Sequence, residues 1–147
     1  MVILAAVGEK RDPTPIIETA HELATAFDDE LQVLHVLPED GSESHLDAIR
    51  SIDAHSDKSF SVGGDRGEDI ATRFIERALG EDPDGDVSAI GHIGDPTEEI
   101  LSAVKRTEPR YLVLGGKNRS PTGKALFGSV TQSVILNSDR PVVTVKG

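Results

Sequence analysis

The chain has 147 residues, a length that favours one compact domain over residues 1–147 with a core that needs no disulfides. It has no cysteine, which excludes a disulfide scaffold, a Cys-ligated zinc site and thiol catalysis. A net charge of −11 and an aromatic content of 3% argue against nucleic-acid binding. No apolar run reaches the roughly 20 residues that span a bilayer, and the apolar start lacks the basic flank and cleavage site of a signal peptide. We therefore expect a cytoplasmic protein without a membrane partner.

The acidity predicts adaptation to high salt, because 26 Asp and Glu face only 15 Lys and Arg. Ordinary solubility is the alternative explanation. If the halophilic interpretation holds, salt screens the repulsion between carboxylates and stability rises with salt concentration. A flat or falling stability across a salt series would contradict it.

The first half of the chain alternates strand-like and helical patterns. Residues 2–7 form a continuous apolar run, typical of a strand covered on both faces. Asp12 and Pro13 indicate a helix start, with proline in the first helical position, and apolar residues then recur at helical spacing up to Phe27. Residues 31–37 predict a second strand. The polar stretch from Glu39 to Gly64 is weakly periodic and predicts at most a short helix around Ser44 to Ala54.

The second half continues the alternation. A helix is predicted over residues 65–79, ended by Gly80, and a strand over residues 87–93. Asp95, Pro96 and Glu98 form a strong helix start, and that helix is expected to reach about Thr107.

Three further elements close the chain. Residues 111–114 predict the fourth strand, and a glycine-rich loop is expected to open at Gly115. Apolar residues at helical spacing from Leu126 to Ile135 predict the last helix, and the stretch from Pro141 to Val145 predicts the last strand.

This order of elements predicts a single α/β domain, a doubly wound open sheet of five parallel strands with helices on both faces. Ligands of such sheets bind at the carboxyl ends of the strands, near the point where the strand order reverses. The functional site is therefore expected in the loops after the first and fourth strands. The five histidines have no metal-ligand spacing and no nucleophile has a recognisable base, so no catalytic or metal-ligating residue is predicted.

The segment after the fourth strand has features of a phosphate site. Glycines let backbone N–H groups approach an anion, and the N-terminus of the last helix adds free donors and partial positive charge. Cationic side chains are available from Lys117, Arg119 and Lys124, and a hydroxyl from Ser129. The alternative is a plain strand-to-helix turn that needs glycine for geometry alone.

The distribution of charge favours the first interpretation. Residues 105–147 contain eight Lys and Arg against two acids, a net charge of +6, whereas residues 1–104 carry −17. Local positive charge in an otherwise repulsive field suits a small phosphate-bearing ligand. The alternative is that these cations only screen neighbouring acids.

The spacing Gly115-x2-Asn118-x9-Gly128-Ser129 resembles the G-x2-G-x9-G-[S/T] nucleotide signature of the universal stress protein family. Other matches follow in the same order: Ile3-Leu4-Ala5-Ala6-Val7, Leu34-His35-Val36, Gly94-Asp95-Pro96-x-Glu98-Glu99-Ile100 and Arg140-Pro141-Val142-Val143-Thr144-Val145. The resemblance implies strand order 3-2-1-4-5 and a homodimer through the last strand, here Pro141 to Val145.

The resemblance also implies an ATP site. Gly115, Asn118, Gly128 and Ser129 would hold the phosphates, Lys117, Val130 and Thr131 would lie alongside, and Leu114 and Arg119 belong to the same segment. Val36 would offer its backbone to the adenine, and Ala6, Val7 and Gly8 would line the base and ribose. The sequence departs from the family pattern at Asn118, where the second glycine stands, and at Gly8, where an aspartate usually ends the first strand.

The sequence thus predicts a stress-response regulator that binds ATP, alone or with Mg²⁺, as a homodimer. It would have no dedicated catalytic activity and at most hydrolyse ATP slowly. One alternative is an interaction or scaffold protein of the same fold that binds no nucleotide, which the two departures motivate. A second alternative is an enzyme that activates a substrate with ATP, and its mark would be release of AMP and pyrophosphate.

Overall fold

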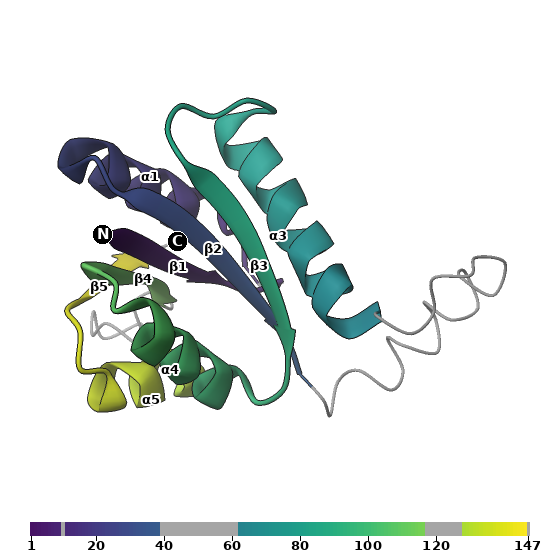
Figure 1. Ribbon diagram of the computed structural model, residues 1–147. Helices are drawn as coiled ribbons and strands as arrows, with labels where there is room; N and C mark the ends of the chain where they lie inside the picture. The colour runs from purple at the N-terminus through teal and green to yellow at the C-terminus, as the bar shows by residue number, and fades with distance from the viewer. Residues whose placement is uncertain (10, 39–61, 117–127, 147) are drawn as a thin grey trace, which may run out of the picture.

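The computed structural model describes residues 1–9, 11–38, 62–116 and 128–146, with no side-chain detail for 62–65. In these ranges strands and helices alternate along the chain (Figure 1): β1 (Val2–Val7), α1 (Thr14–Phe27), β2 (Glu30–Leu37), α3 (Val62–Leu79), β3 (Val87–Ile93), α4 (Pro96–Thr107), β4 (Tyr111–Gly116), α5 (Ser129–Asn137) and β5 (Val142–Lys146). The short helix expected around Ser44 to Ala54 lies outside the described residues, and α3 begins at Val62, three residues before its predicted start.

The five strands form one parallel sheet in the order β3-β2-β1-β4-β5, which confirms the predicted fold class and strand order. The chain builds outward from β1 to β3 and then crosses back to β4 on the other side of β1. The strand order therefore reverses between β1 and β4, whose pairing runs from Ile3–Tyr111 to Ala5–Val113. In open α/β sheets ligands bind at such a reversal, outside the carboxyl ends of the strands.

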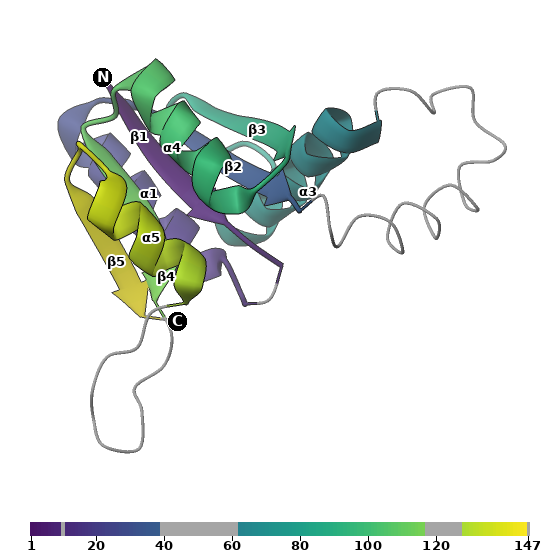
Figure 2. The same cartoon turned by 90° about the horizontal axis from the view of Figure 1, so that it is seen from below.

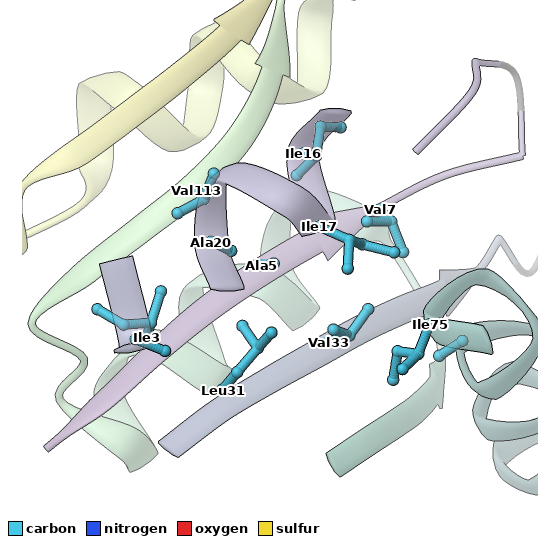
Figure 3. Close-up of a cluster of buried hydrophobic side chains, with 12 residues drawn as sticks. Ile3, Ala5, Val7, Ile16, Ile17, Ala20, Leu31, Val33, Ile75 and Val113 are labelled. Carbon is cyan, nitrogen blue, oxygen red and sulfur yellow. The ribbon is translucent and has the colours of Figure 1, made fainter. Parts of the chain in front are cut away.

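Helices cover both faces of the sheet (Figures 1 and 2). Along β1 the side chains of Ile3, Ala5 and Val7 pack with α1 and α3, whereas Leu4 and Ala6 pack with α4 and α5. This alternation explains why the run reads as continuously apolar, because both faces of the strand are buried. Figure 3 shows the first of these clusters, with side chains of β1, β2 and β4 gathered around α1.

Capping residues in the sequence predicted several helix ends to within one residue. The Asp95 carboxylate accepts a hydrogen bond of 3.0 Å from the Glu98 N–H and caps α4, as predicted from the Asp-Pro start. Gly80 ends α3 with φ +87°, a backbone conformation that favours glycine. Helix α1 begins at Thr14, one residue later than expected, and the Asp12 carboxylate accepts a bond from the Thr14 N–H.

Three boundaries at the functional end of the sheet differ from the prediction. Helix α5 begins at Ser129, with Gly128 as its N-cap, instead of near Leu126. The loop expected to open at Gly115 begins later, because Gly115 and Gly116 are the last two residues of β4 and pair with Val145 and Lys146. Strand β5 begins at Val142 instead of Pro141, although the Pro141 carbonyl still accepts a hydrogen bond from the Leu112 N–H.

The amino ends of the strands are joined by an ion pair. The side chain of Asp29 is only 2% exposed, and its carboxylate lies 2.7 Å from Arg110 Nε and 3.3 Å from the amino group of Met1. The Arg110 guanidinium also lies over the Phe27 ring, 4.4 Å from its centre. Its hydrogen bond to Asp29 lowers the pKa of that carboxyl below its ordinary value, although burial opposes the shift.

Within the described ranges, none of the helices combines the length and apolar character needed to cross a bilayer.

Candidate functional site at the carboxyl edge of the sheet

Three elements meet where the strand order reverses. Strand β1 ends at Val7, its neighbour β4 ends at Gly116, and α5 begins at Ser129. The Thr131 hydroxyl in the first turn of α5 donates a 3.0 Å hydrogen bond to the carbonyl of Gly115. This bond fixes the start of α5 against the end of β4, so the structure brings these predicted site residues together.

Gly115 lies close to the side chain of Ile16 on α1. A Cβ at this position would lie 2.7 Å from Cδ1 of Ile16 on α1, which is closer than carbon atoms approach. Its carbonyl already accepts from Thr131. Cδ1 of Ile16 is the far end of a flexible side chain, which can shift, and the φ of Gly115 lies outside the left-handed region that favours glycine. Packing and backbone geometry therefore do not by themselves require a glycine at this position.

An apolar floor lies beneath the same edge. Ala6, Val36 and Leu114, on three different strands, belong to one buried cluster, and Val130 of α5 packs against it. Ala6 and Val36 are each 9% exposed, so both reach the surface of the cluster. Val7 instead packs on the opposite face, with α1 and α3. Of the residues expected to line a base and ribose, the structure thus places Ala6 and Val36 on one face and Val7 on the other.

Backbone donors are available at the start of α5. Gly128 is the N-cap residue, has extended backbone geometry and supplies no side-chain hydrogen bond to the first turn. The exposed Ser129 follows it. A helix N-terminus without a side-chain cap leaves its first N–H groups for water or an external acceptor, and its dipole favours an anion.

Gly8, the first residue after β1, has room for a Cβ among the described residues. A Cβ built on Gly8 would meet no heavy atom of the described residues within 4 Å. Pairing between β1 and β2 ends at Val7–His35, so Gly8 and Val36 both lie just beyond the paired part of the two strands. A side chain or a ligand can therefore occupy the space beside Gly8.

A buried histidine supports the end of β1. His35 is 3% exposed, and its Nδ1 donates a 2.9 Å hydrogen bond to the carbonyl of Val7. Its Nε2 lies 4.0 Å from the Glu9 carboxylate, and its ring meets the edge of Phe74 at 5.9 Å between centres. Because a carbonyl can only accept, Nδ1 carries the proton, and His35 acts as a structural support for the β1–α1 connection.

Arg11 is a residue of this edge that the sequence reasoning missed. It lies in the β1–α1 connection, and its Nη1 donates a hydrogen bond to the carbonyl of Gly116 at the end of β4. The two residues are 105 positions apart, so no local pattern predicts their contact.

Three predicted site residues, Lys117, Asn118 and Arg119, lie outside the described residues. In the part of the chain that is described, no group of three or more His, Asp or Glu side chains could hold a metal ion.

The sequence matches a known family over almost its whole length. The model of the universal stress protein family matches residues 1–146. A universal stress protein of Mycolicibacterium smegmatis is 44% identical over 52 residues, which are 35% of this chain and 40% of that protein. The stress response protein NhaX of Bacillus subtilis is 30% identical over 82 residues, 56% of this chain and 48% of that protein. The matched segments thus span less than half the length of either relative.

Solved structures share the fold. A universal stress protein from Archaeoglobus fulgidus superposes with a TM-score of 0.65 at 24% identity and covers 99% of this chain and 98% of its own. The universal stress protein from the same organism in complex with dAMP superposes with a TM-score of 0.62 at 20% identity. The match covers 99% of this chain and 98% of that chain. A universal stress protein in complex with cAMP superposes with a TM-score of 0.56 at 17% identity. The match covers 97% of this chain and 95% of that chain. At these identities the likeness concerns the fold.

Proposed function

The chain belongs to the universal stress protein family, and we propose that it binds ATP at the carboxyl edge of β1 and β4. In this role it acts as a nucleotide-dependent stress-response regulator without a dedicated catalytic activity. The observation that carries the proposal is the meeting of three features at the strand reversal: an apolar floor, open space beside Gly8, and the N-terminus of α5 held there by Thr131. Together they offer a surface for a base and donors for phosphates.

The proposed site has two halves. The phosphates lie against the end of β4 and the start of α5, with Gly115, Asn118, Gly128 and Ser129 around them and the cations Lys117 and Arg119 in the intervening segment. Val130 packs under this half and Thr131 positions it. The adenine and ribose lie over the other half, formed by Ala6, Gly8 and the backbones of Val7 and Val36, since the Val7 side chain packs on the opposite face of the sheet. Structural neighbours complexed with dAMP and cAMP support an adenine nucleotide as the ligand class.

Any Mg²⁺ enters this site bound to the phosphates of ATP. The described residues hold no carboxylate cluster that would bind the metal by itself, and Mg²⁺ commonly reaches nucleotide sites through phosphates and retained waters.

Strand β5 supports the proposed homodimer. It is the last strand of the sheet and pairs with β4 on one side only. Pairing with a second copy would cover this edge, which otherwise presents unpaired backbone groups. A cytoplasmic location and adaptation to high salt complete the proposal, and both rest on sequence composition.

Titration calorimetry with ATP and Mg²⁺, at the salt concentration of greatest stability, tests the ATP site. We expect binding that Ser129→Glu weakens by at least about tenfold, because a carboxylate at the start of α5 repels phosphates. Leu136→Glu adds the same charge two turns along α5, at a side chain 75% exposed, and serves as the matched control. Absence of heat up to about 1 mM ATP limits binding to weaker than roughly −4 kcal/mol and favours the nucleotide-free scaffold instead.

A further inference from the structure

We infer that Arg11 is the specificity-determining residue of the proposed nucleotide site: it contacts the ligand's phosphates while its guanidinium bridges the β1–α1 connection to the end of β4. The inference rests on the proposed function and deepens it, because it selects polyphosphate nucleotides over nucleosides. It starts from the hydrogen bond between Arg11 Nη1 and the Gly116 carbonyl.

The position of Arg11 is the first argument. The sheet reverses between β1 and β4, and Arg11 is the described side chain that joins the segment after β1 to the last residue of β4. Gly115, one residue earlier, accepts from Thr131 of α5. The carbonyls of Gly115 and Gly116 thus tie α5 and the β1–α1 connection to one strand end, so that Arg11 and the start of α5 border the same edge.

The lack of a countercharge is the second argument. Among the described residues, no carboxylate lies within 4.0 Å of Arg11. The adjacent Asp12 is turned to the Thr14 N–H, and the Glu9 carboxylate lies near His35. In a chain with a net charge of −11, where acids outnumber bases, a half-buried arginine without an acidic partner is unusual. An external anion would supply the missing charge.

The chemistry of the guanidinium is the third argument. Arginine has five N–H donors in a rigid planar fork, and the described contact to Gly116 uses one nitrogen. The remaining donors suit bidentate contact with phosphate oxygens, which lysine cannot reproduce as a point charge. Bonding to Gly116 holds the fork in place, so that less rotamer entropy is lost when phosphate binds.

Calorimetry on four proteins tests the inference: wild type, Arg11→Ala, Arg11→Lys and the matched control Arg73→Ala, which removes an exposed arginine from α3. The ligands are ATP with Mg²⁺, AMP, adenosine and inorganic tripolyphosphate. We expect Arg11→Ala to weaken ATP and tripolyphosphate by about tenfold to a hundredfold and to leave adenosine unchanged. Arg11→Lys should recover part of this loss, and Arg73→Ala should bind all ligands like the wild type.

Each contrary outcome has a separate meaning. If the wild type binds ATP and Arg11→Ala binds it equally well, the role of Arg11 is overturned and the proposed function stands. If Arg11→Ala weakens adenosine as much as ATP, Arg11 only supports the loop and the phosphate contact is overturned. If the wild type binds none of the four ligands, the proposed function and this inference both fail.

Discussion

The amino and carboxyl ends of the sheet differ in how their charged groups are paired. At the amino end, the buried Asp29 carboxylate is bonded to Arg110 and to the amino group of Met1. At the carboxyl end, Arg11 bonds to a neutral carbonyl and has no carboxylate within 4.0 Å in the described residues, and α5 begins without a side-chain cap. Among the described residues, the amino end pairs its buried carboxylate with two cationic groups, whereas the carboxyl end has donors without an acidic partner.

The direction of the helices explains part of this difference. Each helix returns the chain from the carboxyl end of one parallel strand to the amino end of the next. Every helix therefore begins at the carboxyl edge and adds the positive end of its dipole there. An anion bound at the end of β4 lies near the positive end of α5, whereas the amino edge needs cations such as Arg110 to balance its carboxylate. The amino end thus has the contacts of a stabilising ion pair, and the carboxyl end is where we propose that the ligand binds.

Arg110→Ala is expected to have the largest effect on stability. It removes the partner of a carboxylate whose side chain is 2% exposed and also the guanidinium that lies over Phe27. An unpaired buried charge is strongly destabilising. Thermal unfolding should show a much lower Tm for this variant than for Arg73→Ala, while ATP affinity below the transition stays that of the wild type. Loss of ATP affinity in the folded variant would break the division between the two ends.

Gly67→Ala tests packing at the far side of the carboxyl edge, where α3 touches β2 and β3. The added Cβ would lie 2.9 Å from Gly91 Cα and 3.1 Å from the His35 carbonyl, both backbone atoms that cannot rotate away. Alanine favours a helix by about 1 kcal/mol over glycine, but the overlap costs more. We expect a net loss of about 1 to 2 kcal/mol in the free energy of unfolding, measured in urea.

Asp69→Ala is the matched control for Gly67→Ala, because it adds alanine at an exposed position of the same helix. It should be neutral or slightly stabilising. Equal stability gains in both variants would show that α3 can move away from β3 without cost.

The strands and helices could be predicted from the sequence because their determinants are local, whereas the strand order followed from the family resemblance. The apolar run of β1 and the Asp95 cap of α4 each specify an element from neighbouring residues. Contacts at the two ends of the sheet are not local. In the sequence, Asp29 has the pattern of a residue at a helix end. Only the fold brings it to Arg110, which is 81 residues away. No spacing rule connects such pairs.

The candidate site was predictable in part for the same reason. The spacing from Gly115 to Ser129 indicates a phosphate loop, yet it does not reveal that Gly115 is paired in β4 and packed against Ile16. A glycine that lies within a strand and one that lies in a ligand-binding loop look alike in sequence. The contact of Arg11 with Gly116 depends on which strands are neighbours, which follows from the sheet order and not from the residues themselves.

Acid sensitivity is expected to come from the amino end. The bond from Arg110 lowers the pKa of Asp29 below the ordinary value of about 3.9 that it regains on unfolding. Between these two values the unfolded chain binds more protons than the folded one, so stability falls as pH falls. The contribution is complete above about pH 4 and disappears below the folded pKa. Urea unfolding from pH 5 to 2.5 should show a weaker pH dependence for Asp29→Asn than for the exposed control Asp82→Asn.

Gly8→Asp is expected to have the smallest effect on stability and sharpens the comparison at the ligand end. A side chain here meets no described heavy atom within 4 Å of its Cβ, so the free energy of unfolding should change by less than about 0.5 kcal/mol. Aspartate is the residue that the family pattern places at this position, and its carboxylate can accept a hydrogen bond from the base or ribose of a bound nucleotide. One such bond is worth about 1 kcal/mol, which predicts roughly fivefold tighter ATP binding by calorimetry.

Gly8→Asn is the control, because it adds an acceptor of similar size without charge. It separates the effect of the new hydrogen bond from the effect of the new negative charge. If Asn tightens binding and Asp weakens it, the phosphates lie closer to Gly8 than proposed, and unchanged affinity in both variants would mean that the open space beside Gly8 is not where the nucleoside binds.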